Sequence, residues 1–198
     1  MSHLDGVTWP PAPIATERLI LRAPEARDRE AMLDLFSDPQ VNAFVGGAEP
    51  REHLEELMPE VPGQRVGFFV IELDGEAIGL VSFDPREAER RGHVRDGGGE
   101  AELGYMLLPR AWGNGYATEA CAAAIEWFTA AAPDEPLVVS TQVANEASLR
   151  LIEKLGFEEI ERHEDWGAAQ WFGALPTPRR SDDGKLTRRA IVGCSFAS

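Results

Sequence analysis

The alternation of hydrophobic and polar residues predicts strands and helices that follow one another closely along the first half of the chain. Residues 17–24 alternate as in a half-buried strand, with Leu19 and Leu21 on one face. Apolar residues at helical spacing predict helices over residues 23–41, where Pro39 ends or interrupts the pattern, and over residues 50–61. Two β-rich runs within residues 66–85 flank Asp74-Gly75, which is typical of a hairpin turn.

The second half predicts a strand over residues 101–109, a helix over 115–132, a buried strand over 136–143, a helix over 145–157 and a hairpin over 158–175. Asn145 suits the N-cap of the fourth helix and Gly156 its C-terminal end. Residues 86–100 lack apolar periodicity and contain three consecutive glycines, so we expect a mobile loop whose basic cluster is a solvated face. The order of elements predicts an α+β fold, a mixed sheet with helices on its faces.

Length and composition predict one soluble domain. The 198 residues suffice for a single core, so we expect an extended segment over residues 1–13, one domain over 14–175 and a polar, poorly ordered tail over 176–198. No run reaches the roughly 20 apolar residues of a membrane span, and the N-terminus lacks signal-peptide features, which predicts a cytoplasmic protein. Cys121 and Cys194 do not form a disulfide framework, and Cys121 suits a core position.

The net charge of −15 argues against a nucleic-acid partner, which would require clustered Lys and Arg. It favours cationic ligands, although a high net charge also serves solubility alone. The four histidines are scattered singly, so no metal site is expected.

The segment RAWGNGYATEA, residues 110–120, places two glycines between the predicted strand and the helix that follows. Unpaired amides and the helix dipole make such a turn an anion site, and glycines let a bulky anion such as pyrophosphate approach the backbone. A P-loop would require Gly-Lys-Ser/Thr, but Gly115 is followed by Tyr116. A dinucleotide fingerprint would require Gly or Ala at Thr118 and an opening βαβ unit.

Residues 110–117 match the Arg/Gln-x-x-Gly-x-Gly/Ala pattern, and the chain thereby resembles the GCN5-related N-acetyltransferases (GNAT). The segment NEASLRLIEKLGF, residues 145–157, resembles the second signature of that superfamily. The segments TERLILR and ELGYMLLP are similar to the RimJ/RimL branch. Over residues 14–175 the resemblance implies a mostly antiparallel, twisted sheet of about seven strands with helices on both faces. It also implies that the fourth and fifth strands splay apart.

The resemblance implies acetyl-CoA as cosubstrate, with its pantetheine arm between the splayed strands. The residues expected to contact it fall into three groups. They are the strand backbone of Met106, Leu107 and Leu108; the turn, with Arg110 and the amides of Trp112, Gly113, Asn114, Gly115, Tyr116 and Ala117; and the helix start, with Asn145 and Ser148.

Acetyl transfer to an amine requires a base for the ammonium and a proton for the departing thiolate. We expect Glu102 to be the base, with Glu100 as the alternative. It is an equally good interpretation that Glu102 is only a surface carboxylate at the start of a strand. Many superfamily members use a tyrosine at the position of Ile152, so the usual acid is missing. The branch places a serine near the sulfur at Ser148, which could instead bond only within its helix. Tyr105 is expected in the core.

The expected acceptor is a cationic primary amine, with the N-terminus of a peptide or protein favoured. A small-molecule acceptor such as an aminoglycoside or polyamine is the alternative, and a non-catalytic acyl-CoA-binding module is a second one. We expect a monomer or homodimer that binds no membrane. Trp166 and Trp171 are candidates for the wall of the acceptor pocket.

Overall fold

The computed structural model describes residue 4 and residues 6–176 of the chain. One eight-stranded sheet runs through them in the order β1-β2-β3-β4-β5-β6-β8-β7. The strands are β1 (Ile14–Ala15), β2 (Ile20–Arg22), β3 (Phe68–Leu73), β4 (Glu76–Pro85), β5 (Ala101–Leu107), β6 (Leu137–Gln142), β7 (Glu158–Asp165) and β8 (Ala168–Ala174). The helices are α1 (Arg29–Ser37), α2 (Arg51–Leu57), α3 (Tyr116–Ala131) and α4 (Glu146–Lys154), with short 3-10 turns at Ala26–Asp28 and Pro109–Ala111.

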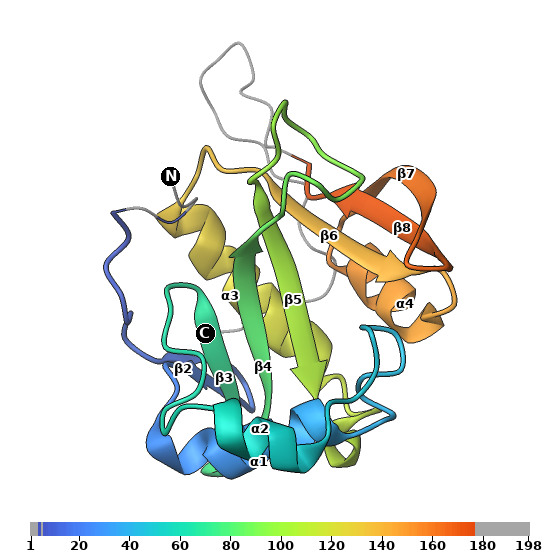
Figure 1. Cartoon of the computed structure of the whole chain (residues 1–198). Helices are drawn as coiled ribbons and strands as arrows, with labels where there is room; N and C mark the ends of the chain where they lie inside the picture. Colours follow the sequence, from blue (N-terminus) through green and yellow to red (C-terminus); the bar gives the residue numbers. More distant parts are fainter. Residues whose placement is uncertain (1–3, 5, 177–198) are drawn as a thin grey trace.

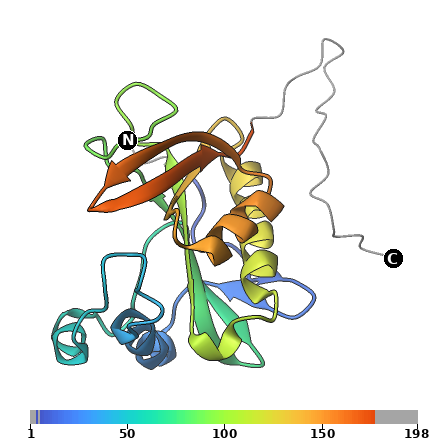
Figure 2. The ribbon, with the colours of Figure 1, turned by 90° about the vertical axis from the view of Figure 1, so that its right-hand side faces the viewer.

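Helices cover both faces of the sheet: α1 and α2 lie on one side, and α3 and α4 lie on the other (Figure 2). On the first side Met32 and Leu35 of α1 pack against Val70 and Leu80 of the sheet. On the second side the α3 stripe that includes Cys121, Ala124 and Phe128 enters the larger core. The alternating strands and the helical stripes predicted from the sequence therefore form two apolar layers around the sheet.

Strands β5 and β6 diverge after a short paired stretch. They run parallel and pair only at Ala101 with Leu137 and at Glu102 with Val138. By contrast, β5 pairs with β4 along the whole length of β5, from Ala101 with Pro85 to Leu107 with Gly79. Beyond Glu102 the edge of β5 that faces β6 therefore opens into a gap (Figure 1). The predicted splay between the fourth and fifth long strands is confirmed.

The number of strands differs from the prediction. A short extra strand, Ile14–Ala15, pairs with β2 and raises the number of strands from about seven to eight. Strand β8 lies between β6 and β7, because the last hairpin folds back so that its second strand pairs with β6. The turn between β3 and β4 is as predicted, with Asp74 and Gly75 both at positive φ.

The segment that precedes β1 packs on the core. The ring of Trp9 meets Phe69 and Trp127 edge to face, at centroid distances of 5.0 and 5.7 Å. The division into a segment over residues 1–13, a domain over 14–175 and a tail over 176–198 stays a prediction. Residues 177–198, and Cys194 with them, lie outside the described residues. None of the described helices has the length and apolar character needed to span a bilayer.

Candidate active site

The glycine turn leaves a strip of backbone amides facing open space. Gly113 has φ +77° and Gly115, the N-cap of α3, has φ +80°, a region that L-residues avoid. The N–H of Glu119 donates to Gly115 O at the start of α3. The amides that come before Glu119 in the first turn therefore have no acceptor within the helix. A Cβ built on Gly113 would meet nothing within 4 Å. Positive φ explains the glycines locally, and the free space is what a bound anion would require.

Side-chain hydrogen bonds fix the shape of this turn. Trp112 Nε1 donates to Leu107 O at 2.7 Å, and Asn114 Nδ2 donates to Trp112 O at 2.9 Å. Arg110 Nη2 donates to Ala77 O at 3.0 Å, which ties the turn to the start of β4. The turn is therefore shaped before any ligand binds.

Arg18, which sequence analysis did not single out, clamps the turn from the β1–β2 connection. Its Nε donates to Glu119 Oε2 at 2.8 Å and its Nη1 donates to Asn114 O at 2.9 Å. Its guanidinium lies 4.6 Å from the centre of the Tyr116 ring. Burial alone would raise the pKa of Glu119, but hydrogen bonds from Thr16 and Arg18 outweigh it and hold that pKa below its ordinary value. The clamp places a cation beside the amides of the turn.

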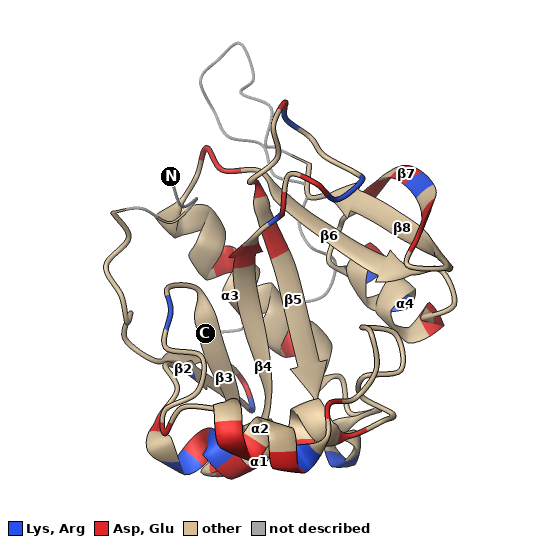
Figure 3. Cartoon of the chain, in the orientation of Figure 1, with Lys and Arg blue, Asp and Glu red and all other residues tan. Residues whose placement is uncertain are grey.

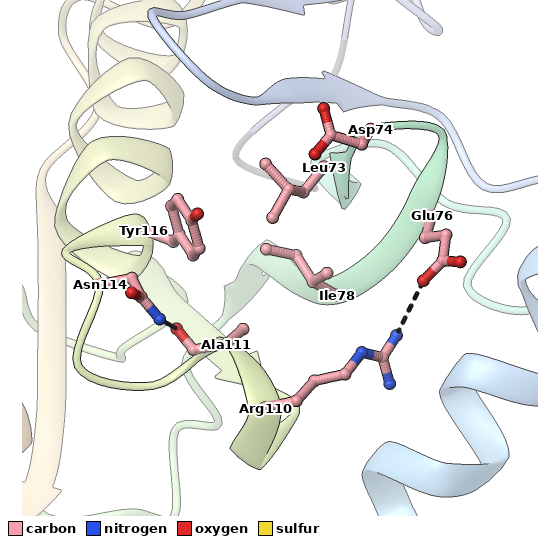
Figure 4. A pocket seen from close by; sticks show the side chains of 8 residues that line it. All are labelled: Leu73, Asp74, Glu76, Ile78, Arg110, Ala111, Asn114 and Tyr116. Atoms are coloured by element: carbon pink, nitrogen blue, oxygen red, sulfur yellow. Dashed lines mark hydrogen bonds and ion pairs between the residues drawn. The ribbon is translucent and has the colours of Figure 1, made fainter.

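A pocket of about 390 Å³ borders the turn on the β3–β4 side (Figure 4). It is lined by Leu73, Asp74, Glu76, Ile78, Arg110, Ala111, Asn114 and Tyr116. A second hollow of about 440 Å³ lies between α1 and the end of β5 and is lined by Asp34, Ser37, Asp38, Pro39, Leu108, Pro109 and Arg110. Both hollows meet at Arg110, and neither lies in the β5–β6 gap. The amide strip and the gap, rather than these hollows, mark the expected path of the cosubstrate.

The register of β5 decides which backbone groups face the gap. Leu108 N donates to Ile78 O on β4. Because hydrogen-bonding groups alternate along an antiparallel strand, the backbone of Met106 is also directed to β4, and that of Tyr105 and Leu107 faces the gap. Of the three residues expected to flank the pantetheine, only Leu107 directs its backbone hydrogen-bonding groups to the gap. Tyr105, which was not among the three, does so as well.

The start of α4 brings two hydroxyl groups together. Asn145 caps the helix as predicted, and its Oδ1 accepts from Ser148 N at 3.1 Å. Tyr105 Oη lies 2.7 Å from Ser148 Oγ, so this contact links β5 to α4 across the gap. Burial raises the pKa of the Tyr105 phenol to about 12, although the hydrogen bond with Ser148 lowers it. Ile152, at the usual tyrosine position, is buried in the core.

Glu102 is held by two arginines of the β4–β5 loop. Arg86 Nη1 lies 2.7 Å from Glu102 Oε1, and Arg90 Nη1 lies 2.8 Å from Glu102 Oε2. Arg86 is fully buried, and its guanidinium stacks 4.8 Å from the centre of the Phe172 ring. That of Arg90 lies 4.8 Å from Trp166. The prediction that the basic cluster of residues 86–100 is a solvated face is therefore wrong for Arg86 and Arg90, because both pair with Glu102 on β5 and both lie over aromatic rings of the β7–β8 hairpin.

Glu100 has a different environment from Glu102. It is completely buried and accepts from Val94 N at 2.7 Å, with His93 Nδ1 3.2 Å away. Burial would raise its pKa, but backbone amides and His93 outweigh that effect and lower it. Glu100 thus holds the β4–β5 loop in place through Val94 and His93. Trp171 is buried in the core, whereas Trp166 is 70% exposed and remains the candidate for an acceptor wall.

Comparison with known proteins identifies the class of enzyme. Residues 18–158, well over half of the chain, match the family model of the acetyltransferase (GNAT) domain, and the chain belongs to this family. It is therefore an N-acetyltransferase that uses acetyl-CoA, rather than a non-catalytic acyl-CoA-binding module.

Individual relatives agree with this class. The chain is 30% identical over 156 residues to the uncharacterized N-acetyltransferase YoaA of Bacillus subtilis, covering 74% of this chain and 82% of YoaA. It is 25% identical over 143 residues to the L-amino acid N-acetyltransferase AaaT of Escherichia coli, covering 71% and 83%. Among solved structures, a GNAT-family acetyltransferase from Bacillus anthracis has a TM-score of 0.66 at 20% identity, covering 82% and 97%. RimL, a ribosomal L7/L12 α-N-protein acetyltransferase in complex with coenzyme A, has a TM-score of 0.61 at 18% identity, covering 82% and 98%.

Proposed function

We propose that the enzyme acetylates the α-amine of a peptide or protein N-terminus, as a RimJ/RimL-like member of its family. The observation that carries this proposal is the state of Glu102. Each of its oxygens accepts one arginine hydrogen bond, so about half of its acceptor positions are occupied and an amine must share the carboxylate with two cations, which suits an acceptor that loses its proton readily. An α-amine has a pKa near 8, against about 10.4 for lysine, which makes its deprotonation cheaper by about 3 kcal/mol.

Two residues beside the gap carry out the proton transfers that a direct attack requires. The neutral amine forms a bond to the thioester carbon, and the carbon–sulfur bond breaks. Glu102 accepts the proton of the ammonium, directly or through water. Ser148 donates its proton to the departing sulfur and takes up the proton that the attacking nitrogen loses as the amide forms. The products are the acetylated amine, the free thiol of coenzyme A and one proton. No covalent enzyme intermediate is required.

The cosubstrate binds along the amide strip and the gap. The amides from Gly113 to Ala117 receive the pyrophosphate, with Arg110 and Arg18 as neighbouring cations; the amide of Trp112, also expected there, already donates to Pro109 O at 3.1 Å. Tyr105 and Leu107 flank the pantetheine by their backbone, and Asn145 and Ser148 contact its far end. Helices α1 and α2 each begin with an arginine and otherwise carry only acidic charges (Figure 3). The cations beside the turn are therefore few: Arg110, and Arg18, which is itself paired with Glu119, in a chain of net charge −15.

A small polycation, such as a polyamine or an aminoglycoside, is the second candidate acceptor. The hollow beside α1 favours it, because Asp34 and Asp38 both line that hollow. Asp34, however, is paired with Arg51 at 2.6 Å. Part of the acidic character of the hollow is therefore already compensated.

Release of free thiol from acetyl-CoA separates these candidates. The acceptors to compare are short peptides with a free N-terminus, the same peptides blocked at the N-terminus but containing lysine, polyamines and aminoglycosides. The proposal predicts the highest kcat/KM for the peptides with a free N-terminus. A preference for a polyamine or an aminoglycoside would replace it with the second candidate.

A further inference from the structure

Tyr105, which the sequence predicts only as a core residue, forms a hydrogen bond with Ser148 through its hydroxyl group. The two residues are 43 positions apart and come from β5 and α4, on opposite sides of the β5–β6 gap. Their oxygens are 2.7 Å apart, which is a short, well-formed O–H···O distance. Ser148 is buried, at 8% exposure, so its hydroxyl group has few alternative partners.

The direction of this hydrogen bond follows from the chemistry of the two groups. A phenol is a stronger acid than an aliphatic hydroxyl and is therefore the better donor. Burial raises the pKa of Tyr105 to about 12, so the phenol retains its proton at neutral pH. A serine hydroxyl carries one proton and two lone pairs. When Ser148 Oγ accepts from Tyr105, its own proton must point elsewhere.

The backbone of Ser148 is fixed as well. Its N–H donates to Asn145 Oδ1, so the residue sits in the first turn of a capped helix. With the Cα anchored by the cap and the Oγ held by the phenol, the remaining freedom is the direction of the serine O–H. Ile152, one turn further along α4, is buried and carries no hydroxyl that could compete.

We propose that Tyr105 is a positioning residue that donates to Ser148 Oγ and so turns the serine proton toward the sulfur of the leaving group. The proposal rests on the role of Ser148 as the donor to that sulfur. Tyr105 does not itself give up its proton in this scheme. The proton that reaches the sulfur is that of Ser148, and the phenol reduces the number of orientations the serine hydroxyl can adopt.

A double-mutant cycle tests this coupling. Tyr105→Phe removes one oxygen and keeps the ring in place, and Ser148→Ala removes the proposed donor. We expect Ser148→Ala to lower kcat by about 100-fold, the low end for loss of a general acid. Tyr105→Phe should lower kcat by roughly 3- to 10-fold, the usual scale of one hydrogen bond, with the KM for acetyl-CoA unchanged. In the Ser148→Ala background, Tyr105→Phe should have no further effect on kcat.

Thr129→Val is the control for loss of a hydroxyl group, because Thr129 Oγ1 bonds only locally to Glu126 O on α3, and its kcat should equal that of the wild type. Wild-type turnover of Ser148→Ala would overturn the role of Ser148 and, with it, the coupling. If Ser148→Ala is impaired but Tyr105→Phe is not, the positioning role alone is overturned. The same holds if Tyr105→Phe costs as much in the Ser148→Ala background, or if it raises the KM for acetyl-CoA instead.

Discussion

Replacing Gly115 by alanine distinguishes the two reasons for a glycine at the mouth of α3. One reason is backbone conformation, since φ is +80°, and the other is the close approach of the cosubstrate. Within the described protein, an added Cβ would lie no closer than 3.5 Å to any atom, and that atom is Arg18 Nη2 at the end of a long side chain. Steric conflict inside the protein is therefore small, and the folding cost of Gly115→Ala is the left-handed strain, about 1–2 kcal/mol.

Gly156→Ala provides a matched control. Gly156 follows α4 with φ +85°, and an added Cβ there would also meet nothing within 4 Å. Both variants should lose about 1–2 kcal/mol in the free energy of unfolding. For a chain of this size that loss lowers Tm by roughly 2–8 °C.

Only Gly115→Ala should also weaken binding of coenzyme A. The added methyl group occupies space beside amides that are expected to donate to the pyrophosphate, and a hydrogen bond to a charged group contributes about 1.5–3 kcal/mol. The Kd measured by calorimetry should rise roughly 10- to 150-fold for Gly115→Ala, since 1.4 kcal/mol is a factor of ten, and stay at the wild-type value for Gly156→Ala. Equal Kd values for the wild type and both variants would refute the assignment of the glycine turn to the pyrophosphate.

Three further substitutions test the charged groups around the site. Arg18→Gln removes a cation beside the amides of the turn and leaves Glu119 without its ion-pair partner, so the Kd for coenzyme A should rise by about 2- to 5-fold; an unchanged Kd would make the clamp irrelevant to binding. Glu102→Gln should lower kcat/KM by about 100-fold, with a smaller loss at high pH, where the amine is already neutral; a loss that does not vary with pH argues against a base. Burial would raise the pKa of Asp28, but hydrogen bonds from Arg22 and the Glu25 amide outweigh it and lower that pKa. The stability contributed by Asp28 is thus complete above its unfolded pKa of about 3.9 and is lost as pH falls through the lower folded value. Asp28→Asn should lower the free energy of unfolding, measured by chemical denaturation, by about 3–5 kcal/mol at pH 7. Between about pH 5 and 2 that free energy should depend less on pH in the variant than in the wild type; the same pH dependence in both proteins would contradict this account.

Local patterns were enough to predict the parts of the site that depend on neighbouring residues. The hairpin turn at Asp74 and Gly75, the cap at Asn145 and the glycine turn each rest on a short stretch of sequence with a strong backbone preference. The splay of β5 from β6 followed from the resemblance to the family, and no pattern within the strands themselves indicates it.

The errors concern side chains whose partners are distant in sequence. The β4–β5 loop looks like a solvated segment because its arginines have no apolar period, yet Arg86 is buried between Glu102 and Phe172. Tyr105 packs against the larger core as strand alternation predicts, but alternation gives the face of a residue and not the partner of its hydroxyl group. Arg18 lies about 100 positions from Glu119, so nothing local indicates their pairing. Tertiary contacts of this kind depend on the sheet order, which the periodicity of single strands does not determine.

The site of the acetyl group on a peptide with two different amines tests the central claim most directly. A synthetic peptide with a free N-terminus and one internal lysine is incubated with acetyl-CoA and enzyme at pH 7.5, and fragmentation mass spectrometry locates the added acetyl group. The account predicts acetylation at the α-amine, with little at the lysine side chain, and about 100-fold slower formation of the product with Ser148→Ala. Acetylation confined to the lysine, or equal modification of both amines, would contradict it.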